Sequence, residues 1–462
     1  MTAVTTGRPD VRRITPADPS AAAELAGVNP GAVLAAIAGG AIATIALWWH
    51  DTASIHGLGD WLTNAGRITG LLAGYAMVVL VALMARIPPL ERGIGADRLA
   101  RWHAHGGRYS VSLVVAHGLL IIWGYSVTAH TDVVSQTSTL LVSYPDVLMA
   151  TVAGLLLLGV GIVSARAARR RMRYETWYYL HFYTYLAIAL AFSHQFATGA
   201  DFMTNAPARL VWAAMYIAVG AAILWYRFAV PLIQASRHQM CVAAVQQEAP
   251  GVVSIVVSGR DLDRLRATSG QFFRWRFLTR DLWWAANPYS LSAAPRPNSL
   301  RITVKDLGEH SAALRRLRPG TRVVAEGPYG AMTVARRTRR KVLLVAGGIG
   351  ITPIRALFES LPAEPADITL IYRVRHEADV VFRDELAAIA RQRGARLLVV
   401  AGRRHDLGWD PLSAEALAAA VPDIGQHDVY ICGPEPMTGA VRRALRAARV
   451  PRGRVHCESF EF

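Results

Sequence analysis

Four histidines lie inside otherwise apolar stretches of this 462-residue chain, and they fall into two pairs of long spacing. His103 and His117 are fourteen residues apart, and His181 and His194 are thirteen apart. Bis-histidine ligation of haem iron needs two neutral imidazoles that face each other across an apolar slot. Because an ionisable group inside a bilayer is costly, these residues are the first candidates for chemistry. The alternative is that each histidine only hydrogen-bonds a neighbouring helix.

The spacing of each pair limits how it can be used. Fourteen residues are close to four helical turns, so His103 and His117 share a face and lie about 21 Å apart along the axis. His105 is a worse partner for His117, because twelve residues rotate the face by about 120°. Thirteen residues rotate it by about 220° in a straight helix, so His181 and His194 predict an overwound or distorted helix, or a different pairing.

The elements that must position these histidines are apolar enough to cross a membrane. Hydrophobic residues make up 53% of the chain and charged residues only 18%, which is unusual for a soluble protein of this length. Six runs are each close to the ~20 residues that a spanning helix needs. They lie at about 31–49, 67–86, 106–126, 147–165, 178–197 and 209–232. The third and fifth runs, which carry the histidines, then cross in the same direction.

Charge along the chain predicts the orientation. The formal net charge is +17, and the loops at 86–108 and 164–177 are strongly basic, whereas the other connecting loops are acidic or neutral. The positive-inside rule therefore predicts a multi-pass protein of the cell membrane with both termini in the cytoplasm. Residues 1–30 lack the features of a cleaved signal and predict a flexible cytosolic tail. No basic stripe with interleaved aromatic residues indicates nucleic-acid binding.

Arg67 stands at the expected outer start of the second run. It could contact a haem propionate or the electron acceptor, or it could extend to the lipid headgroups as an interfacial arginine. The three cysteines, Cys241, Cys432 and Cys457, show no metal-ligand spacing and all lie in the expected cytosolic half, so disulfides are not expected.

After Arg237 the pattern changes to short alternating strands that continue to about residue 335. Within them, NPYSLSAAP (287–295) places a tyrosine before a serine on a strand. Tyr289 could stack on a flavin ring while Ser290 approaches its N5 edge. Gly308 and Ser311 follow at the start of a short helix, where backbone N–H groups suit a pyrophosphate, although Ser311 alone could be an ordinary N-cap.

From Lys341 onward strands alternate with helices, which predicts an α/β unit with a parallel sheet. AGGIGITPI (346–354) lies between a strand and a helix, so its backbone can approach a phosphate closely. It is not the G-x-G-x-x-G fingerprint. The residues that we expect to hold the nicotinamide nucleotide there are Gly347, Gly348, Gly350 and Thr352.

Two later segments complete the expected nucleotide site. Cys432 and Gly433 end a later strand, where a ligand of a parallel sheet lies, and Cys432 would face the nicotinamide. The alternative for Cys432 is a small buried residue. Arg373 and Arg375 follow the second strand of the unit, where an arginine suits the 2′-phosphate of NADPH; NADH is the alternative.

WHAHGGRYSVSLVVAH and YYLHFYTYLAIALAFSH resemble the ferric reductase and NADPH oxidase transmembrane family. The resemblance implies that His103 and His181 bind an inner haem b, and that His117 and His194 bind an outer one. The thirteen-residue spacing also occurs in that family.

The C-terminal half resembles the ferredoxin–NADP reductase superfamily, with NPYSLSAAP as its flavin motif and AGGIGITPI as its nucleotide loop. Asn287 stands where that superfamily often has arginine or histidine, so a charged contact to the flavin phosphates is not expected there. The resemblance implies a terminal aromatic residue over the flavin, Phe460 or alternatively Phe462. Cys432, Ser290 and Phe460 are then the residues expected at the site of hydride transfer.

The implied architecture is a six-helix membrane bundle followed by a ferredoxin–NADP reductase-like module. The expected domains are the tail (1–30), a di-haem membrane domain (31–235), an antiparallel β-barrel that binds FAD (236–336) and an α/β domain that binds NAD(P)H (337–462).

Electrons would pass from cytosolic NAD(P)H through FAD and two haems to an acceptor beyond the outer face, since haem accepts one electron at a time. Ferric iron is the first candidate acceptor and dioxygen, giving superoxide, the second. A haem-free flavoreductase that is tethered to the membrane and serves a soluble partner is an alternative of another class. A transporter or receptor with a nucleotide domain would leave NPYSLSAAP unexplained.

Overall fold

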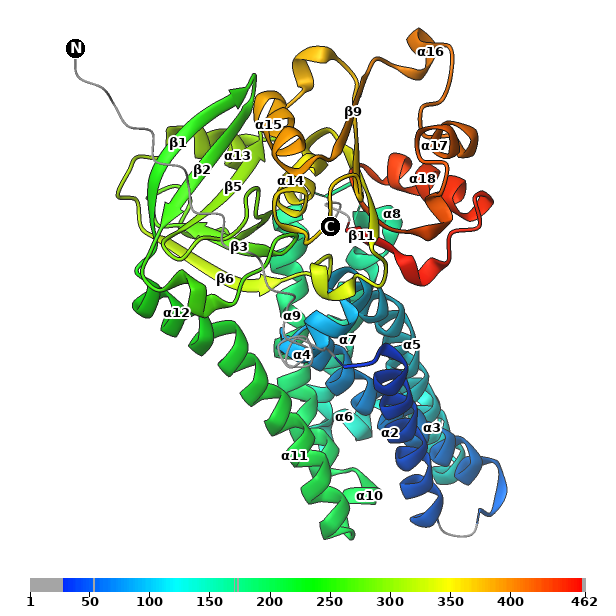
Figure 1. Cartoon of the computed structure of the whole chain (residues 1–462). Coiled ribbons are helices and arrows are strands. Elements are labelled where there is room, and N and C mark those ends of the chain that lie inside the picture. Colours follow the sequence, from blue (N-terminus) through cyan, green and yellow to red (C-terminus); the bar gives the residue numbers. More distant parts are fainter. Residues whose placement is uncertain (1–27, 53–54, 170, 173, 459–462) are drawn as a thin grey trace, which may run out of the picture. The chain divides into compact units, whose positions relative to one another are not determined.

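A computed structural model describes residues 28–52, 55–169, 171–172 and 174–458 (Figure 1). Nearly all of the predicted N-terminal tail, together with Phe460 and Phe462, lies outside the described residues. The described chain forms two compact units, one within residues 28–229 and one within residues 230–458.

The first unit is helical. Asn29 caps its first helix with a side-chain hydrogen bond to the N–H of Gly31, and Pro30 occupies the first helical turn, where its missing N–H is not needed. The long helices are α2 (Pro30–His50), α3 (Gly57–Leu83), α5 (Ala96–Ala129), α7 (Val147–Ser164), α9 (Tyr174–Ala197) and α11 (Ala206–Ile223). The short ones are α4 (Pro88–Ile94), α6 (Val133–Ser143), α8 (Arg166–Arg169) and α10 (Ala200–Met203). A π-helical turn, Leu224–Ala229, follows α11 and leads into α12 (Val230–His238).

Within the part of the chain that the structure describes, five helices are long and apolar enough to cross a membrane by length and composition. They are Pro30–His50, Gly57–Leu83, Arg98–Ala129, Val147–Ser164 and Ala206–His238. The predicted span at 178–197 is a helix, α9, but it is not among the five. Its five tyrosines and two histidines make it less apolar than the others. The sequence therefore placed the helix correctly, and the count of six spans remains a prediction.

Small residues bring α3 and α5 close together. A Cβ added to Gly124 on α5 would lie 2.4 Å from Thr63 Oγ1, and one added to Gly59 on α3 would lie 2.3 Å from Thr128 Oγ1. Contacts this short leave no space for a side chain at either glycine. Glycines at such positions let helix backbones approach within a membrane bundle, so the two helices form one rigid pair.

The second unit begins with α12 and two antiparallel sheets of three strands (Figure 1). The first has the order β1 (Cys241–Ala249), β2 (Val252–Ser258), β5 (Ser299–Lys305). The second has the order β4 (Asn287–Ser290), β3 (Phe272–Phe277), β6 (Val323–Tyr329). Both sheets contribute to one hydrophobic core around Phe273, Trp275 and Ile302. Two bridges join the sheets, one between Leu291 and Ile302 and one between Cys241 and Arg322. The β-barrel that we expected here stays a prediction.

The rest of the unit is the predicted α/β fold with a parallel sheet. Its five strands have the order β11 (Val455–Glu458), β10 (His427–Cys432), β7 (Lys341–Gly347), β8 (Ile368–Val374), β9 (Arg396–Ala401), and every neighbouring pair is parallel. Alternate strand residues pack against α14 (Ile351–Ser360) and α15 (Arg383–Arg393) on one face. The others pack against α17 (Ala414–Ala420) and α18 (Glu435–Ala447) on the opposite face. The carboxyl ends of β7 and β10 therefore carry the glycine loop and Cys432 at one edge of the sheet.

Candidate functional site

The structure brings the four histidines together as two pairs. The ring centroids of His103 on α5 and His181 on α9 are 5.8 Å apart. Those of His117 on α5 and His194 on α9 are 6.4 Å apart. Both pairs are the ones that the resemblance implies, and α9 is an uninterrupted α-helix, so neither distortion nor another pairing is needed.

The thirteen-residue spacing on α9 has a simple account. Around the axis of α9, His181 and His194 are separated by about 220°, which is about 140° measured the other way. Each can therefore lie about 70° to one side of the direction that faces α5. A histidine side chain is long enough to reach inward from each side. On an ideal helix the two rings on α9 can therefore reach α5 from opposite flanks, whereas the two rings on α5 share one face.

Backbone carbonyls of α3 fix the α5 rings. His103 Nδ1 lies 3.0 Å from the carbonyl oxygen of Leu80, and His117 Nδ1 lies 2.8 Å from that of Gly66. The two carbonyls are fourteen residues apart, as the two histidines are, because α3 and α5 run antiparallel. A neutral imidazole that donates from Nδ1 presents the lone pair of Nε2 on the other side of the ring.

Side chains near α9 play the same part for its two rings. His194 Nδ1 lies 2.9 Å from Thr198 Oγ1, which itself donates to the carbonyl of His194. His181 Nδ1 lies 3.4 Å from Ser164 Oγ, a longer contact. Trp177 stacks on the His181 ring with centroids 5.2 Å apart. None of the described residues forms a hydrogen bond with Nε2 of the four histidines.

These positions fit a metal between each pair. Two ring nitrogens that each lie about 2 Å from one metal ion place their ring centroids roughly 6 Å apart. The observed separations, 5.8 Å and 6.4 Å, bracket that value. An outer hydrogen bond from the second ring nitrogen is the usual way in which proteins orient ligating histidines. The arrangement therefore suits iron held by two imidazoles in an apolar slot.

Arg67 has a partner that the sequence did not reveal. It lies in the third turn of α3, because the helix begins at Gly57 rather than near Arg67. Its Nη2 is 2.6 Å from Oδ1 of the buried Asp201, and its Nη1 is 3.0 Å from Asn64 Oδ1. The guanidinium is thus held inside the helical unit by a buried carboxylate.

The predicted flavin residues lie on β4. Tyr289 pairs with Phe273 on β3, and its carbonyl accepts from the Trp275 indole at 3.0 Å. Burial raises the pKa of the Tyr289 hydroxyl to about 12, so the ring stays neutral. Ser290 is 3% exposed, and its Oγ has no hydrogen-bond partner among the described residues. A buried hydroxyl without a partner is costly, so Ser290 fits a ligand atom such as the polar edge of a flavin.

Gly308 lies at the start of a short helix as expected, but the Ser311 hydroxyl is engaged in local hydrogen bonds. Gly308 precedes the short helix Glu309–Ala313. Ser311 Oγ donates to the Gly308 carbonyl at 2.9 Å and accepts from the N–H of Leu307 at 2.8 Å. The hydroxyl therefore closes a local turn, and any phosphate contact here would come from the backbone.

The glycine loop and the end of β10 are in direct contact. A Cβ on Gly350 would lie 2.3 Å from the carbonyl oxygen of Cys432, and a Cβ on Gly433 would lie 3.1 Å from the Cα of Gly347. Gly348 has a φ of +53°, a conformation that favours glycine. The loop thus packs against the next strand end in a way that only glycines allow.

Three other residues shape this loop. Thr352 is buried, and its Oγ1 donates to the Ile349 carbonyl at 3.0 Å, which holds the turn into α14. Met437, which the sequence did not single out, lies where a side chain on Gly347 or Gly433 would fall. Cys432 is fully buried. It pairs with Glu458 on β11, the last described residue before Phe460.

The two arginines after β8 differ in their contacts. Arg373 donates to the carbonyls of Val374, Val400 and Gly402. Its guanidinium therefore binds the backbone at the end of β9. Arg375 is exposed directly after β8. Arg403, which follows the neighbouring parallel strand β9, is exposed as well, and the sequence did not single it out. Arg375, whose side chain is exposed, therefore fits a contact with a 2′-phosphate better than Arg373, and both residues stay predictions.

Two family models match the chain. Residues 69–192 match the ferric reductase like transmembrane component, a range that contains His103, His117 and His181 and ends two residues before His194. Residues 344–443 match the oxidoreductase NAD-binding domain, a range that contains the glycine loop and Cys432.

Curated relatives match less than half of the chain. The chain is 34% identical over 233 residues to the ferredoxin reductase component of 3-ketosteroid-9-alpha-monooxygenase from Mycolicibacterium smegmatis, covering 48% of this chain and 65% of the relative. It is 33% identical over 189 residues to ferredoxin–NADP reductase B from Sorangium cellulosum, covering 37% of this chain and 77% of the relative. A solved ferredoxin reductase of carbazole 1,9a-dioxygenase covers 48% of this chain and 68% of its own at 22% identity, with a TM-score of 0.42.

Proposed function

Because the chain belongs to the ferredoxin–NADP reductase family and carries a ferric reductase-like membrane component before that module, we propose that it is a transmembrane electron-transfer enzyme. It takes electrons from cytosolic NAD(P)H and delivers them to an acceptor beyond the outer face of the membrane. Its resident cofactors are FAD and two haems b. The first acceptor that we propose is ferric iron.

The observation that carries the proposal is the pair of histidine sites. His103 with His181, and His117 with His194, hold four imidazoles at separations that suit two metal centres. Four histidines that served only as hydrogen-bond partners of neighbouring helices would have no reason to meet as two facing pairs. When bound, FAD supplies the change from hydride to single electrons and the haems supply one-electron carriers across the apolar layer.

The residues of the chain then bind, orient and exclude water. Leu80, Gly66 and Thr198 hold the Nδ1 side of three rings, which keeps Nε2 directed at its partner ring. Tyr289 offers an apolar ring face to the flavin. Ser290 offers a buried hydroxyl that has no hydrogen-bond partner among the described residues.

In the nucleotide site the glycine loop admits the phosphates and Arg375 binds the 2′-phosphate of NADPH. Cys432, at the end of β10, would face the nicotinamide, and Phe460, or alternatively Phe462, would cover the flavin when nucleotide is absent. No general acid or base is required for this reaction.

A second candidate deserves a test because several relatives are reductase components that serve oxygenases. In that case the chain would be a haem-free flavoreductase that is tethered to the membrane and passes electrons to a soluble partner. Dioxygen is the other candidate for the acceptor in the first case.

Purified protein in liposomes separates these possibilities. With NADPH outside and ferricyanide or an Fe(III) chelate trapped inside, vesicles whose second unit faces outward should reduce the trapped acceptor. His117→Ala should stop that reduction while leaving reduction of an external acceptor intact. Reduction of external acceptors alone by the wild type would favour the haem-free candidate. Superoxide formation at the expense of Fe(III) reduction would identify dioxygen as the acceptor.

A further inference from the structure

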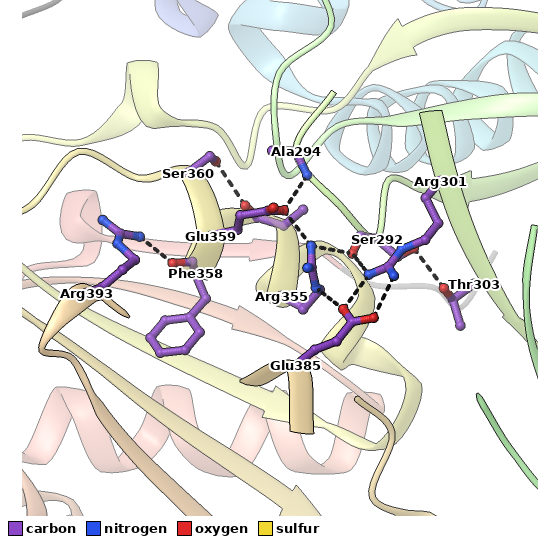
Figure 2. Close-up of polar contacts among 11 residues, drawn as sticks. Ser292, Ala294, Arg301, Thr303, Arg355, Phe358, Glu359, Ser360, Glu385 and Arg393 are labelled. Atoms are coloured by element: carbon purple, nitrogen blue, oxygen red, sulfur yellow. Dashed lines mark hydrogen bonds and ion pairs between the residues drawn. The ribbon is translucent and has the colours of Figure 1, made fainter. Parts of the chain in front are cut away.

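A network of charged side chains joins the two halves of the second unit (Figure 2). Arg301 on β5 forms a two-point contact with Glu385 on α15, at 2.8 and 2.9 Å. Arg355 on α14 contacts the same carboxylate at 2.9 Å and pairs with Glu359 one turn further along its helix. We call Arg301, Arg355, Glu359 and Glu385 the clamp.

The clamp also holds the backbone that follows the flavin motif. The carbonyl of Ser292 accepts from Arg301 at 3.0 Å and from Arg355 at 3.2 Å. The N–H of Ala294 donates to Glu359 at 2.8 Å. Ser292 and Ala294 come two and four residues after Ser290, so the clamp grips the strand end that presents Tyr289 and Ser290.

The same residues lie just behind the nucleotide loop. Arg355 is the fifth residue of α14, which begins directly after Gly350. A rigid helical turn therefore connects the glycine loop to the arginine that binds Ser292. The clamp thus ties the expected flavin segment to the expected nicotinamide segment through a few side chains (Figure 2).

The clamp is balanced in charge and geometrically specific. It contains two arginines and two glutamates, and the Arg301 guanidinium beside Glu385 holds the pKa of that carboxyl below its usual value. Arg355 is 7% exposed, so its charge depends on these partners. Two-point contacts between a guanidinium and a carboxylate fix direction as well as distance.

Hydride transfer demands that kind of precision. Donor and acceptor atoms must approach to about 3–3.5 Å, and a displacement of about 1 Å can cost on the order of a hundredfold in rate. We propose that Arg301, Arg355 and Glu385 are positioning residues for hydride transfer, which set the spacing between the flavin strand and the nucleotide loop. The inference rests on the proposed reaction of NAD(P)H with FAD, and none of the three residues needs to touch either cofactor.

The test uses the full-length protein loaded with FAD and compares Glu385→Gln with Glu377→Gln. Glu377 is the matched control, because it pairs with Arg383 at the start of the same helix but is exposed and has no contact with the flavin half among the described residues. Anaerobic mixing with NADPH measures the limiting rate of flavin bleaching and the apparent affinity separately.

Glu385→Gln should lower the limiting rate by about tenfold or more, with less than about a threefold change in the apparent affinity. Glu377→Gln should change neither quantity. The double variant Arg301→Met with Glu385→Met removes charge in balance and is expected to fold, yet it should remain slow. Hydrogen exchange should quicken in both 287–295 and 351–360 in the clamp variants, and in neither segment in the control.

A wild-type limiting rate in the folded, FAD-loaded double variant would overturn the inference. So would unchanged hydrogen exchange in the two segments of the Glu385→Gln variant. A wild-type protein whose flavin neither NADPH nor NADH reduces would instead refute the proposed function, and the inference would fall with it.

Discussion

Replacing Gly70 by alanine should weaken the outer histidine site without unfolding the helix. Gly70 lies on α3 against the His117 ring, and an added Cβ would be 2.7 Å from Nδ1 and 2.9 Å from Cε1. Carbon atoms in ordinary contact are about 3.5–4.0 Å apart. The ring must therefore move by roughly 1 Å, which breaks or stretches its 2.8 Å hydrogen bond to Gly66.

The size of the effect follows from what the ring loses. A hydrogen bond of this kind contributes about 0.5–1.5 kcal/mol, and a strained χ angle costs about 0.5–1.5 kcal/mol. The sum is about 2 kcal/mol, which corresponds to a roughly 30-fold loss of affinity for a ligand of His117. Alanine is favoured over glycine by about 1 kcal/mol in a helix, so α3 itself should remain intact.

Gly118→Ala is the matched control, because Gly118 follows His117 on α5 and an added Cβ there would meet nothing within 4 Å. Haem content per chain and a potentiometric titration of the visible spectrum report the outcome. Gly70→Ala should lose most of one of the two haem components, and Gly118→Ala should keep both. Equal haem content and equal titrations in the two variants would refute the role that we assign to the His117 ring.

Three further predictions concern the second unit. Arg375→Gln should raise KM for NADPH by roughly tenfold and leave KM for NADH nearly unchanged, which steady-state kinetics with both nucleotides measures. Arg373→Gln should mainly destabilise the fold. Gly350→Ala should abolish nucleotide binding by calorimetry, because its Cβ would lie 2.3 Å from the Cys432 carbonyl oxygen. Burial lowers the pKa of His427, so the unfolded state binds a proton below about 6.5 that the folded state does not. Stability should therefore fall as pH drops below that value, by up to about 1.4 kcal/mol per pH unit, and His427→Gln should flatten the dependence in denaturant titrations at pH 7.5 and 5.5.

The sequence predicted the elements of both units because their patterns are local. Strand, glycine loop and helix at 341–360 follow each other as expected, since alternating apolar runs and glycines fix them without distant contacts. The four histidines stood out because polar residues are rare in apolar runs. Their pairing came from family resemblance, and spacing alone argued against the thirteen-residue pair. The structure removes that difficulty, because both α9 rings lie within 6.4 Å of their α5 partners on one uninterrupted helix.

Other features depend on partners that lie far away in the sequence. Arg67 binds Asp201, 134 residues later, and Arg301 binds Glu385, 84 residues later. No local pattern marks such pairs. Arg373 and Arg375 were both predicted to suit a 2′-phosphate. The Arg373 guanidinium donates to carbonyls at the end of the next strand, whereas Arg375 is exposed. The sequence does not show which arginine contacts backbone carbonyls and which is exposed. The structure therefore reveals this difference between Arg373 and Arg375.

The number of haems per chain in the purified protein tests the central claim most directly. A pyridine haemochrome assay and a reduced-minus-oxidised spectrum should give two haems b for the wild type, and about one for His117→Ala and for His181→Ala. A wild-type protein that shows only the absorption of flavin would contradict the account. So would variants that keep both haems.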